Sequence, residues 1–112
     1  MARRILSVCY EECLPPSTIE FLEAAGCEMT CIREPGAALQ RFESAPFDLI
    51  LINKTVSGSQ EHLLVEQVRQ QSTVPIIFVS GSPELTPTDV NVCLHAPVKP
   101  GDLLRSIIEL VP

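Results

Sequence analysis

Polar residues that could do chemistry stand at the ends of short apolar runs along this chain. They offer a thiol, a phenol, an amide, a hydroxyl and an ammonium, on Cys9, Tyr10, Asn53, Ser80 and Lys99 respectively. If the apolar runs form an open parallel sheet, a site is expected outside the carboxyl ends of the strands, near the point where strand order reverses. The sequence therefore predicts that these five side chains gather at one edge of a sheet.

Short apolar runs of strand type alternate with longer segments of helical spacing. We predict strands over residues 5–10, 27–32, 47–52, 74–79 and 90–94. The third run is apolar except for Asp48, which is typical of a strand covered by helices on both faces. This alternation indicates a parallel sheet with right-handed crossovers, in a (βα)5 three-layer α/β sandwich.

The helical segments carry start and stop signals. Ser17 with Glu20 has the form of a capping box, Gly26 closes the first helix, and Pro35 stands where a first helical residue would. Asp102 is the expected cap of the last helix. Apolar residues at helical spacing give the third and the last helix a buried face: Leu64, Val65 and Val68, and Leu103, Leu104, Ile107, Ile108 and Val111. Residues 81–89 contain two prolines and few helix signals, so we expect a shortened or irregular fourth helix.

The length and composition of the chain fit one domain over residues 1–112. A net charge of −6 argues against direct binding to nucleic acid and to an anionic membrane surface. No apolar run approaches the roughly 20 residues that span a bilayer, and no signal peptide precedes the first strand. We therefore interpret the five cysteines as reduced thiols of a cytoplasmic protein.

Three segments, residues 47–53, 74–81 and 98–100, resemble the receiver domain of two-component response regulators, and the resemblance covers essentially the whole chain. It implies the CheY-like, flavodoxin-like strand order 2-1-3-4-5. It also implies a role for each position of the phosphorylation site. Asn53 takes the phospho-acceptor position, Ser80 that of the hydroxyl residue on the phosphoryl group, and Lys99 that of the lysine before proline. Cys9 and Tyr10 take the places of the two acids that hold Mg²⁺, and Ala96 that of the aromatic switch residue.

These departures from the family pattern change the expected chemistry. Forming an acyl phosphate needs a carboxylate nucleophile, and the Asn53 amide is neutral. Mg²⁺ prefers hard anionic oxygen ligands, which Cys9 and Tyr10 do not supply. We therefore expect a pseudo-receiver that is not an enzyme, holds no metal or cofactor, and acts by protein–protein contact. The expected partners are a histidine kinase, an output protein, another receiver or a second copy, docking on the fourth crossover, the fifth strand and the last helix.

Two other functions stay open on the residues. A thiol-based redox sensor would pair Cys9 with a neighbour such as Cys31, although small buried cysteines are more often simply hydrophobic. A small-molecule binder would use the vacated pocket at Tyr10, Asn53 and Lys99. Structural roles are also open: Asn53 as a strand-end cap, Ser80 as a strand-end hydroxyl, and Lys99 bonded to Asn53, to a main-chain carbonyl or to solvent. His62 and His95 each stand alone, without a second ligand or base nearby in sequence.

Overall fold

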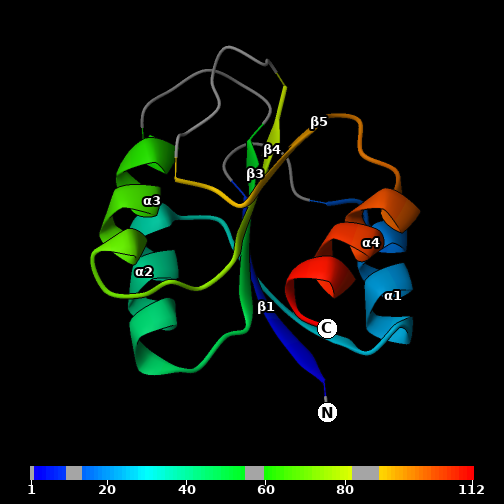
Figure 1. Cartoon of the computed structure of the whole chain (residues 1–112), viewed down its shortest axis with the longest axis horizontal. Coiled ribbons are helices and arrows are strands. Elements are labelled where there is room, and N and C mark those ends of the chain that lie inside the picture. Colours follow the sequence, from blue (N-terminus) through cyan, green and yellow to red (C-terminus); the bar gives the residue numbers. More distant parts are fainter. Residues whose placement is uncertain (1, 10–13, 55–59, 82–88) are drawn as a thin grey trace.

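Five parallel strands form one sheet in the order β2-β1-β3-β4-β5, which confirms the predicted topology (Figure 1). The computed structural model describes residues 2–9, 14–54, 60–81 and 89–112. The strands are β1 (Arg3–Cys9), β2 (Cys27–Ile32), β3 (Leu49–Lys54), β4 (Ile76–Ser80) and β5 (Val92–His95). The helices in the described ranges are α1 (Pro16–Ala24), α2 (Pro35–Ser44), α3 (Gln60–Arg69) and α4 (Pro100–Leu110).

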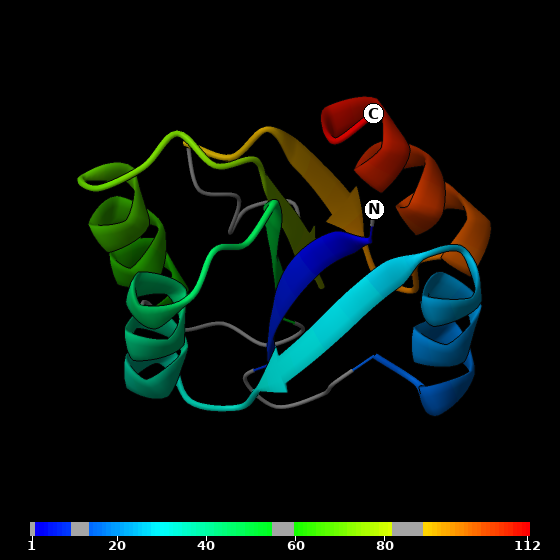
Figure 2. The ribbon, with the colours of Figure 1, turned by 90° about the horizontal axis from the view of Figure 1, so that it is seen from below.

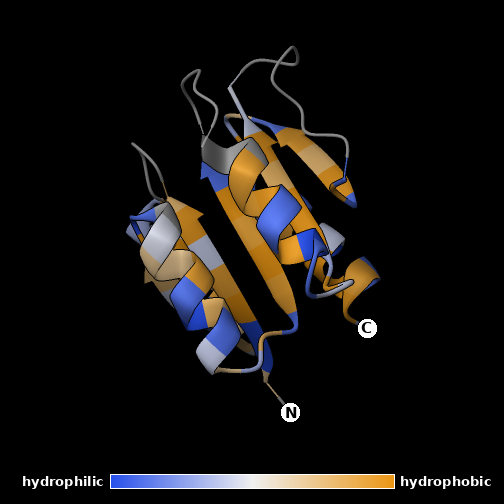
Figure 3. Cartoon of the chain, turned by 90° about the vertical axis from the view of Figure 1, so that its left-hand side faces the viewer, coloured by the Kyte–Doolittle hydropathy of each residue, from blue (hydrophilic) through white to orange (hydrophobic). Residues whose placement is uncertain are grey.

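The sheet lies between two layers of helices. Helices α2 and α3 cover one face, and α1 and α4 cover the other (Figures 1 and 2). Successive side chains of a strand point to opposite faces of the sheet, so each central strand contributes side chains to both helix layers. Ile50 and Ile52 pack with α2 and α3, whereas Leu49 and Leu51 pack with α1 and α4. Figure 3 shows the strands as largely hydrophobic, whereas the helices alternate hydrophobic and hydrophilic residues. The nearly continuous apolar runs of the sequence follow from this burial on both sides.

Two predicted helix caps are wrong. Helix α1 begins at Pro16, so Ser17 lies inside the first turn, and the cap residue Pro15 makes no side-chain hydrogen bond. The Pro15 carbonyl instead accepts from the N–H groups of Thr18 and Ile19, at 2.9 and 3.1 Å. Proline at a first helical position fits the helix because it has a suitable fixed φ and no N–H to satisfy.

Helix α4 repeats this arrangement. Pro100 is its first residue and Lys99 its cap, and Asp102 lies in the first turn, where its charge favours the helix dipole. The prediction for the end of α1 is confirmed, because Gly26 follows the helix with φ of +96°, which side chains rarely adopt.

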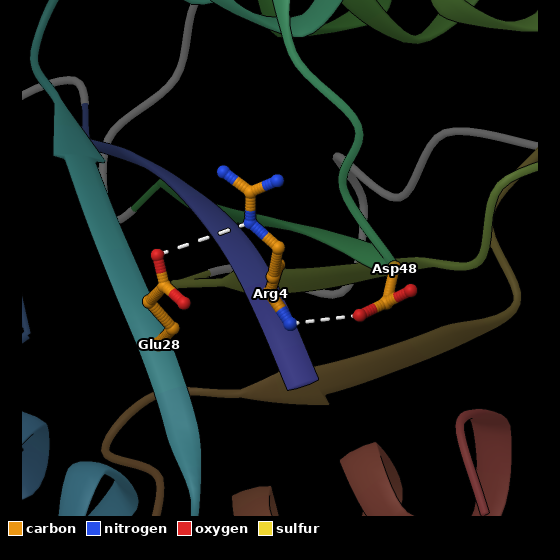
Figure 4. Close-up of polar contacts among 3 residues, drawn as sticks. All are labelled: Arg4, Glu28 and Asp48. Atoms are coloured by element: carbon orange, nitrogen blue, oxygen red, sulfur yellow. Dashed lines mark hydrogen bonds and ion pairs between the residues drawn. The ribbon is translucent and has the colours of Figure 1, made fainter. Parts of the chain in front are cut away.

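Asp48, the polar residue in the third apolar run, ties β3 to the start of β1. Its carboxylate accepts from the Arg4 main-chain N–H at 2.8 Å, and its own N–H donates to the Arg4 carbonyl at 2.8 Å (Figure 4). The Arg4 side chain also lies 3.8 Å from a Glu28 carboxylate oxygen on β2 and 5.6 Å from the centre of the Phe47 ring. Because the ion pair is exposed, it contributes little. The two hydrogen bonds between Asp48 and the main chain of Arg4 fix the register.

The chain passes from β4 to β5 with no helix in the described residues, and residues 82–88 of the predicted irregular helix lie outside them. Arg69, the last residue of α3, contacts the end of this crossover and the segment that precedes β4. Its guanidinium donates to the carbonyl of Val74 at 2.6 Å, to the carbonyl of Asp89 at 3.0 Å and to the amide oxygen of Asn91 at 2.9 Å. That same amide oxygen accepts from the Ile76 N–H at 2.9 Å. Arg69 therefore positions the start of β5 beside β4.

We expect Arg69→Ala to lower the free energy of unfolding by about 1–3 kcal/mol, because it leaves partly buried carbonyl groups without their donor. Urea denaturation followed by circular dichroism measures this change. The control is Arg105→Ala, at an exposed position of α4, for which we expect a change within about 0.5 kcal/mol. Equal effects of the two substitutions would show that Arg69 has no special role.

Candidate functional site

The carboxyl ends of β1, β3 and β4 bring three of the predicted site residues to one edge of the sheet. Cys9 and Asn53 are direct partners in the parallel register of β1 and β3. Asn53 is in turn opposite Val79, next to Ser80. The exposed fractions of Cys9, Asn53 and Ser80 are only 1 %, 6 % and 1 %. Asn53 and Ser80 thus belong to the strands themselves, and each is engaged with a neighbouring group.

The pleat of the sheet separates these side chains. Side chains two residues apart on a strand lie on the same face of the sheet. Asn53 therefore lies on the face of Leu51, and Cys9 on the face of Ile5, which is the face covered by α1 and α4. Ser80 instead has the parity of Ile76 and Phe78, on the side of α2 and α3. The side chains of Cys9 and Asn53 therefore lie on the same face of the sheet, whereas that of Ser80 points toward α2 and α3.

Lys99 lies at the cap of α4, beyond the last residue of β5. Strand β5 ends at His95, whose partner is Ser80, and the N–H of Ala96 donates to the Ser80 carbonyl at 2.9 Å. Ala96 and Pro97 therefore occupy the positions that directly follow β5. Lys99 is exposed at the cap of α4, where its carbonyl accepts from the N–H groups of Asp102 and Leu103. Of the three placements open for the ammonium, this exposure favours solvent.

Tyr10, the other residue assigned to an acidic-pair position, lies outside the described residues, as does Cys13. In the remaining part of the chain, no group of three or more His, Cys, Asp or Glu side chains could hold a metal ion. The described ranges also contain no helix with the length and apolar character needed to cross a membrane. The described strand ends thus present a thiol, an amide and a hydroxyl, which can donate and accept hydrogen bonds.

Ser7 is a polar residue of this region that the sequence patterns did not single out. It lies in the middle of β1, two residues before Cys9 and opposite Leu51, with an exposed fraction of 0 %. Its hydroxyl has no hydrogen-bond partner within the described structure. The signal was present, since Ser7 interrupts an otherwise apolar run, but a single serine in a strand is common enough to be overlooked.

The described cysteines are thiols, and the register keeps them apart. Cys31 is opposite Ser7, two positions back from Cys9 along β1. Strand spacings of about 4.8 Å sideways and 3.3 Å per residue put the Cα atoms of Cys9 and Cys31 about 8 Å apart. Disulfides rarely bridge more than about 7 Å between Cα atoms. The geometry therefore disfavours the Cys9–Cys31 pair of the redox hypothesis without a movement of the main chain.

Comparison with solved structures gives the fold a class. The chain superposes on a CheY-like response regulator receiver domain protein from Methanospirillum hungatei JF-1 with a TM-score of 0.80 and 26 % identity, over 97 % of this chain and 93 % of the other. The signal receiver domain of an HD domain-containing protein from Pseudomonas fluorescens Pf-5 gives a TM-score of 0.84 at 19 % identity, over 99 % and 95 %.

A third similar structure is the response regulator TrrA from Thermotoga maritima, in complex with Mg²⁺ and BeF, with a TM-score of 0.80 at 19 % identity over 99 % and 100 %. No protein-family model and no curated protein sequence matches the chain. The chain therefore has the receiver-domain fold of CheY-like response regulators over nearly its whole length, as the sequence resemblance implied.

We expect the described cysteines to differ widely in reactivity. Cys31 is exposed, whereas Cys9 and Cys27 are buried, and burial raises the pKa of the Cys27 thiol, an effect that nearby Arg3 opposes. Because the thiolate is the reacting form, iodoacetamide at neutral pH should label Cys31 first and Cys27 last. Peptide mass spectrometry at timed intervals gives the order. Rapid labelling of Cys9 or Cys27 in the folded protein would contradict this placement.

We expect Ser7→Ala to leave the melting temperature unchanged or to raise it, because the substitution removes a buried hydroxyl that has no partner. Ser80→Ala is the matched comparison, since Ser80 is equally buried but is engaged with a neighbour. Loss of the Ser80 hydroxyl should lower the free energy of unfolding by about 1 kcal/mol. A lower melting temperature for Ser7→Ala than for the unmodified protein in thermal denaturation would mean that the hydroxyl has a stabilising partner.

Proposed function

We propose that this domain is a pseudo-receiver of two-component signalling, which binds protein partners without being phosphorylated and without catalysing a reaction. The observation that carries the proposal is the amide of Asn53 at the carboxyl end of β3, the acceptor position that the receiver resemblance implies. A carboxamide cannot form the acyl phosphate of a phosphorylated receiver, because its oxygen is a poor nucleophile and it carries no charge.

The neighbourhood of Asn53 supports the same proposal. Its partner on β1 is Cys9, a thiol where the resemblance implies an acidic ligand, so this position offers Mg²⁺ no hard anionic oxygen. The position that directly follows β5, beside Ser80, is Ala96, which brings no positive charge to a phosphoryl group. The acceptor position and one metal-ligand position thus carry neutral groups, whereas Lys99, at the lysine position, is exposed at the cap of α4.

Burial gives a physical reason for a neutral residue at this position. Asn53 is 6 % exposed, and a carboxylate so enclosed is costly unless a cation or several donors compensate for it. An amide satisfies its hydrogen bonds locally without needing a metal ion. We infer that the domain keeps one conformation of its strand ends, and that its partners recognise this fixed state.

The partners proposed are other two-component proteins: a histidine kinase, an output protein, another receiver or a second copy. The proposed contact face combines β5 with α4. Ile108 on α4 supports this choice, because 42 % of this large apolar side chain is exposed to solvent. Leu104 on the same helix is partly buried against the core and could extend the apolar contact.

The proposal is tested by intact-mass measurement after incubation with acetyl phosphate and Mg²⁺. We expect no added phosphoryl group on the unmodified protein, because Asn53 offers no carboxylate. Asn53→Asp restores the acceptor alone, and we expect at most slow labelling, since Cys9 still replaces an acidic ligand. A phosphorylatable CheY-like receiver treated in parallel confirms that the donor is active.

One phosphoryl group on the unmodified protein, stable to alkali or not, would refute the proposal. Peptide mapping would then locate the acceptor. Labelling of a carboxylate in the unmodified protein would mean that another residue takes the place assigned to Asn53.

A further inference from the structure

The last turns of helices α1 and α4 lie at one level, because Arg3 binds the end of each. The Arg3 N–H donates to the carbonyl of Gly26, just past α1, at 3.1 Å. Its side-chain Nε donates to the carbonyl of Val111, the cap of α4, at 2.6 Å. Figures 1 and 2 show the two helices side by side on one face of the sheet, with α1 nearer β2 and α4 nearer β5. The two last turns therefore form one surface near the amino-terminal ends of the strands.

Two exposed apolar side chains lie on this surface. In the described part of the chain, the large apolar side chains that are exposed are Phe21 on α1, Ile108 on α4 and Leu63 on α3, with exposed fractions of 43 %, 42 % and 53 %. Phe21 precedes the cap residue Ala25 by four residues, and Ile108 precedes the cap residue Val111 by three. Since the rise is about 1.5 Å per residue in both helices, Phe21 and Ile108 lie at nearly the same height.

The winding of the two helices turns these side chains toward each other. Phe21 comes one residue before the buried Leu22, and Ile108 one residue after the buried Ile107. At about 100° per residue, the two deviate from the sheet-facing direction in opposite senses, Phe21 toward α4 and Ile108 toward α1. Leu104, one turn before Ile108, is partly buried against the core. Phe21, Leu104 and Ile108 thus form an apolar strip between the helices, which we call the α1–α4 seam.

The surface around the α1–α4 seam is acidic. Helices α1 and α4 carry four exposed carboxylates and one exposed guanidinium, on Glu20, Glu23, Asp102 and Glu109, and on Arg105. Helices α2 and α3, on the other face of the sheet, carry three acidic residues and two arginines, so the acidic excess lies mainly on the seam side. Complementary charge on a partner is therefore positive. A second copy of this chain would bring another acidic surface, and like charges would oppose such a symmetric contact.

We propose that the α1–α4 seam binds a basic amphipathic helix of a partner protein. Apolar residues one turn apart on such a helix lie about 6 Å from each other and would pack along Phe21 and Ile108, while Lys or Arg beside them would meet the carboxylates. A helix suits a site between two helices, because its main-chain groups are paired internally. The inference deepens the proposed function and rests on it for the domain's action through a protein partner. The seam lies far along the strands from Asn53, so binding does not require any state of that residue.

The test titrates the full chain with a short synthetic peptide of Leu, Lys and Ala, in which Leu recurs on one helical face with Lys on both sides of it. Amide chemical shifts of the ¹⁵N-labelled protein locate the contact, and we expect the largest changes in residues 16–24 and 100–110. A peptide with Glu at every Lys position should bind about tenfold more weakly or worse, because its charges repel the acidic surface. Added NaCl should weaken binding of the Lys peptide.

Substitutions in the protein have matched controls on α3. Phe21→Ala and Ile108→Ala should each weaken binding of the Lys peptide by about tenfold, because each removes an apolar anchor. Leu63→Ala truncates an equally exposed apolar side chain on the other face of the sheet and should change binding by less than about twofold. Glu109→Gln should also weaken binding of the Lys peptide, whereas Glu66→Gln on α3 should leave it unchanged.

A Lys peptide with Ser at every Leu position tests the apolar contact without altering the protein, and we expect it not to bind. The proposal is overturned if the millimolar Lys peptide causes no shift changes or changes centred outside α1 and α4, or if the Lys and Glu peptides bind alike. Shift changes in α1 and α4 that depend on protein concentration, without peptide, would overturn it in favour of a second copy. Phosphoryl transfer from acetyl phosphate would refute the pseudo-receiver proposal and leave these binding results unchanged, so the two proposals fail separately.

Discussion

The central strands of this domain are buried on both faces, and the rest of the structure depends on that burial. All five residues of β4 are buried, as are the last five of β1. Two layers of helices are needed to exclude water from such strands, and each helix contributes its own apolar face, as Leu64, Val65 and Val68 of α3 do. Aliphatic burial of this extent is the dominant favourable term in folding. In the described central strands, the polar side chains other than Ser7 lie at the strand ends.

The residues that stabilise the sheet differ from the strand-end residues that could take part in chemistry. The residues that pack the sheet are distinct from Asn53 and Ser80, so the receiver fold can persist while the strand-end side chains change. A buried amide also needs less compensation than a buried carboxylate, because it carries no charge. Neutral side chains at this edge are therefore compatible with a stable domain.

The two outer strands are secured differently. Strand β5 is short, and Arg69 holds its start through hydrogen bonds to Asp89 and Asn91. Strand β2 is longer and pairs with β1 over six positions.

The sequence alone determined the parallel sheet, its strand order through the receiver resemblance, and the gathering of Cys9, Asn53 and Ser80 at one edge. Those features follow from local periodicity and from the rule that parallel strands end together. Local signals failed at the caps, because proline at a first helical position outweighed the hydroxyl of Ser17 and the carboxylate of Asp102. Only the tertiary structure decided the register: it aligned Ala96 beside Ser80, left Lys99 at the start of α4, and kept Cys9 away from Cys31. Register depends on contacts between residues distant in sequence, such as Asp48 with Arg4 and Arg69 with Asn91, which no local pattern encodes.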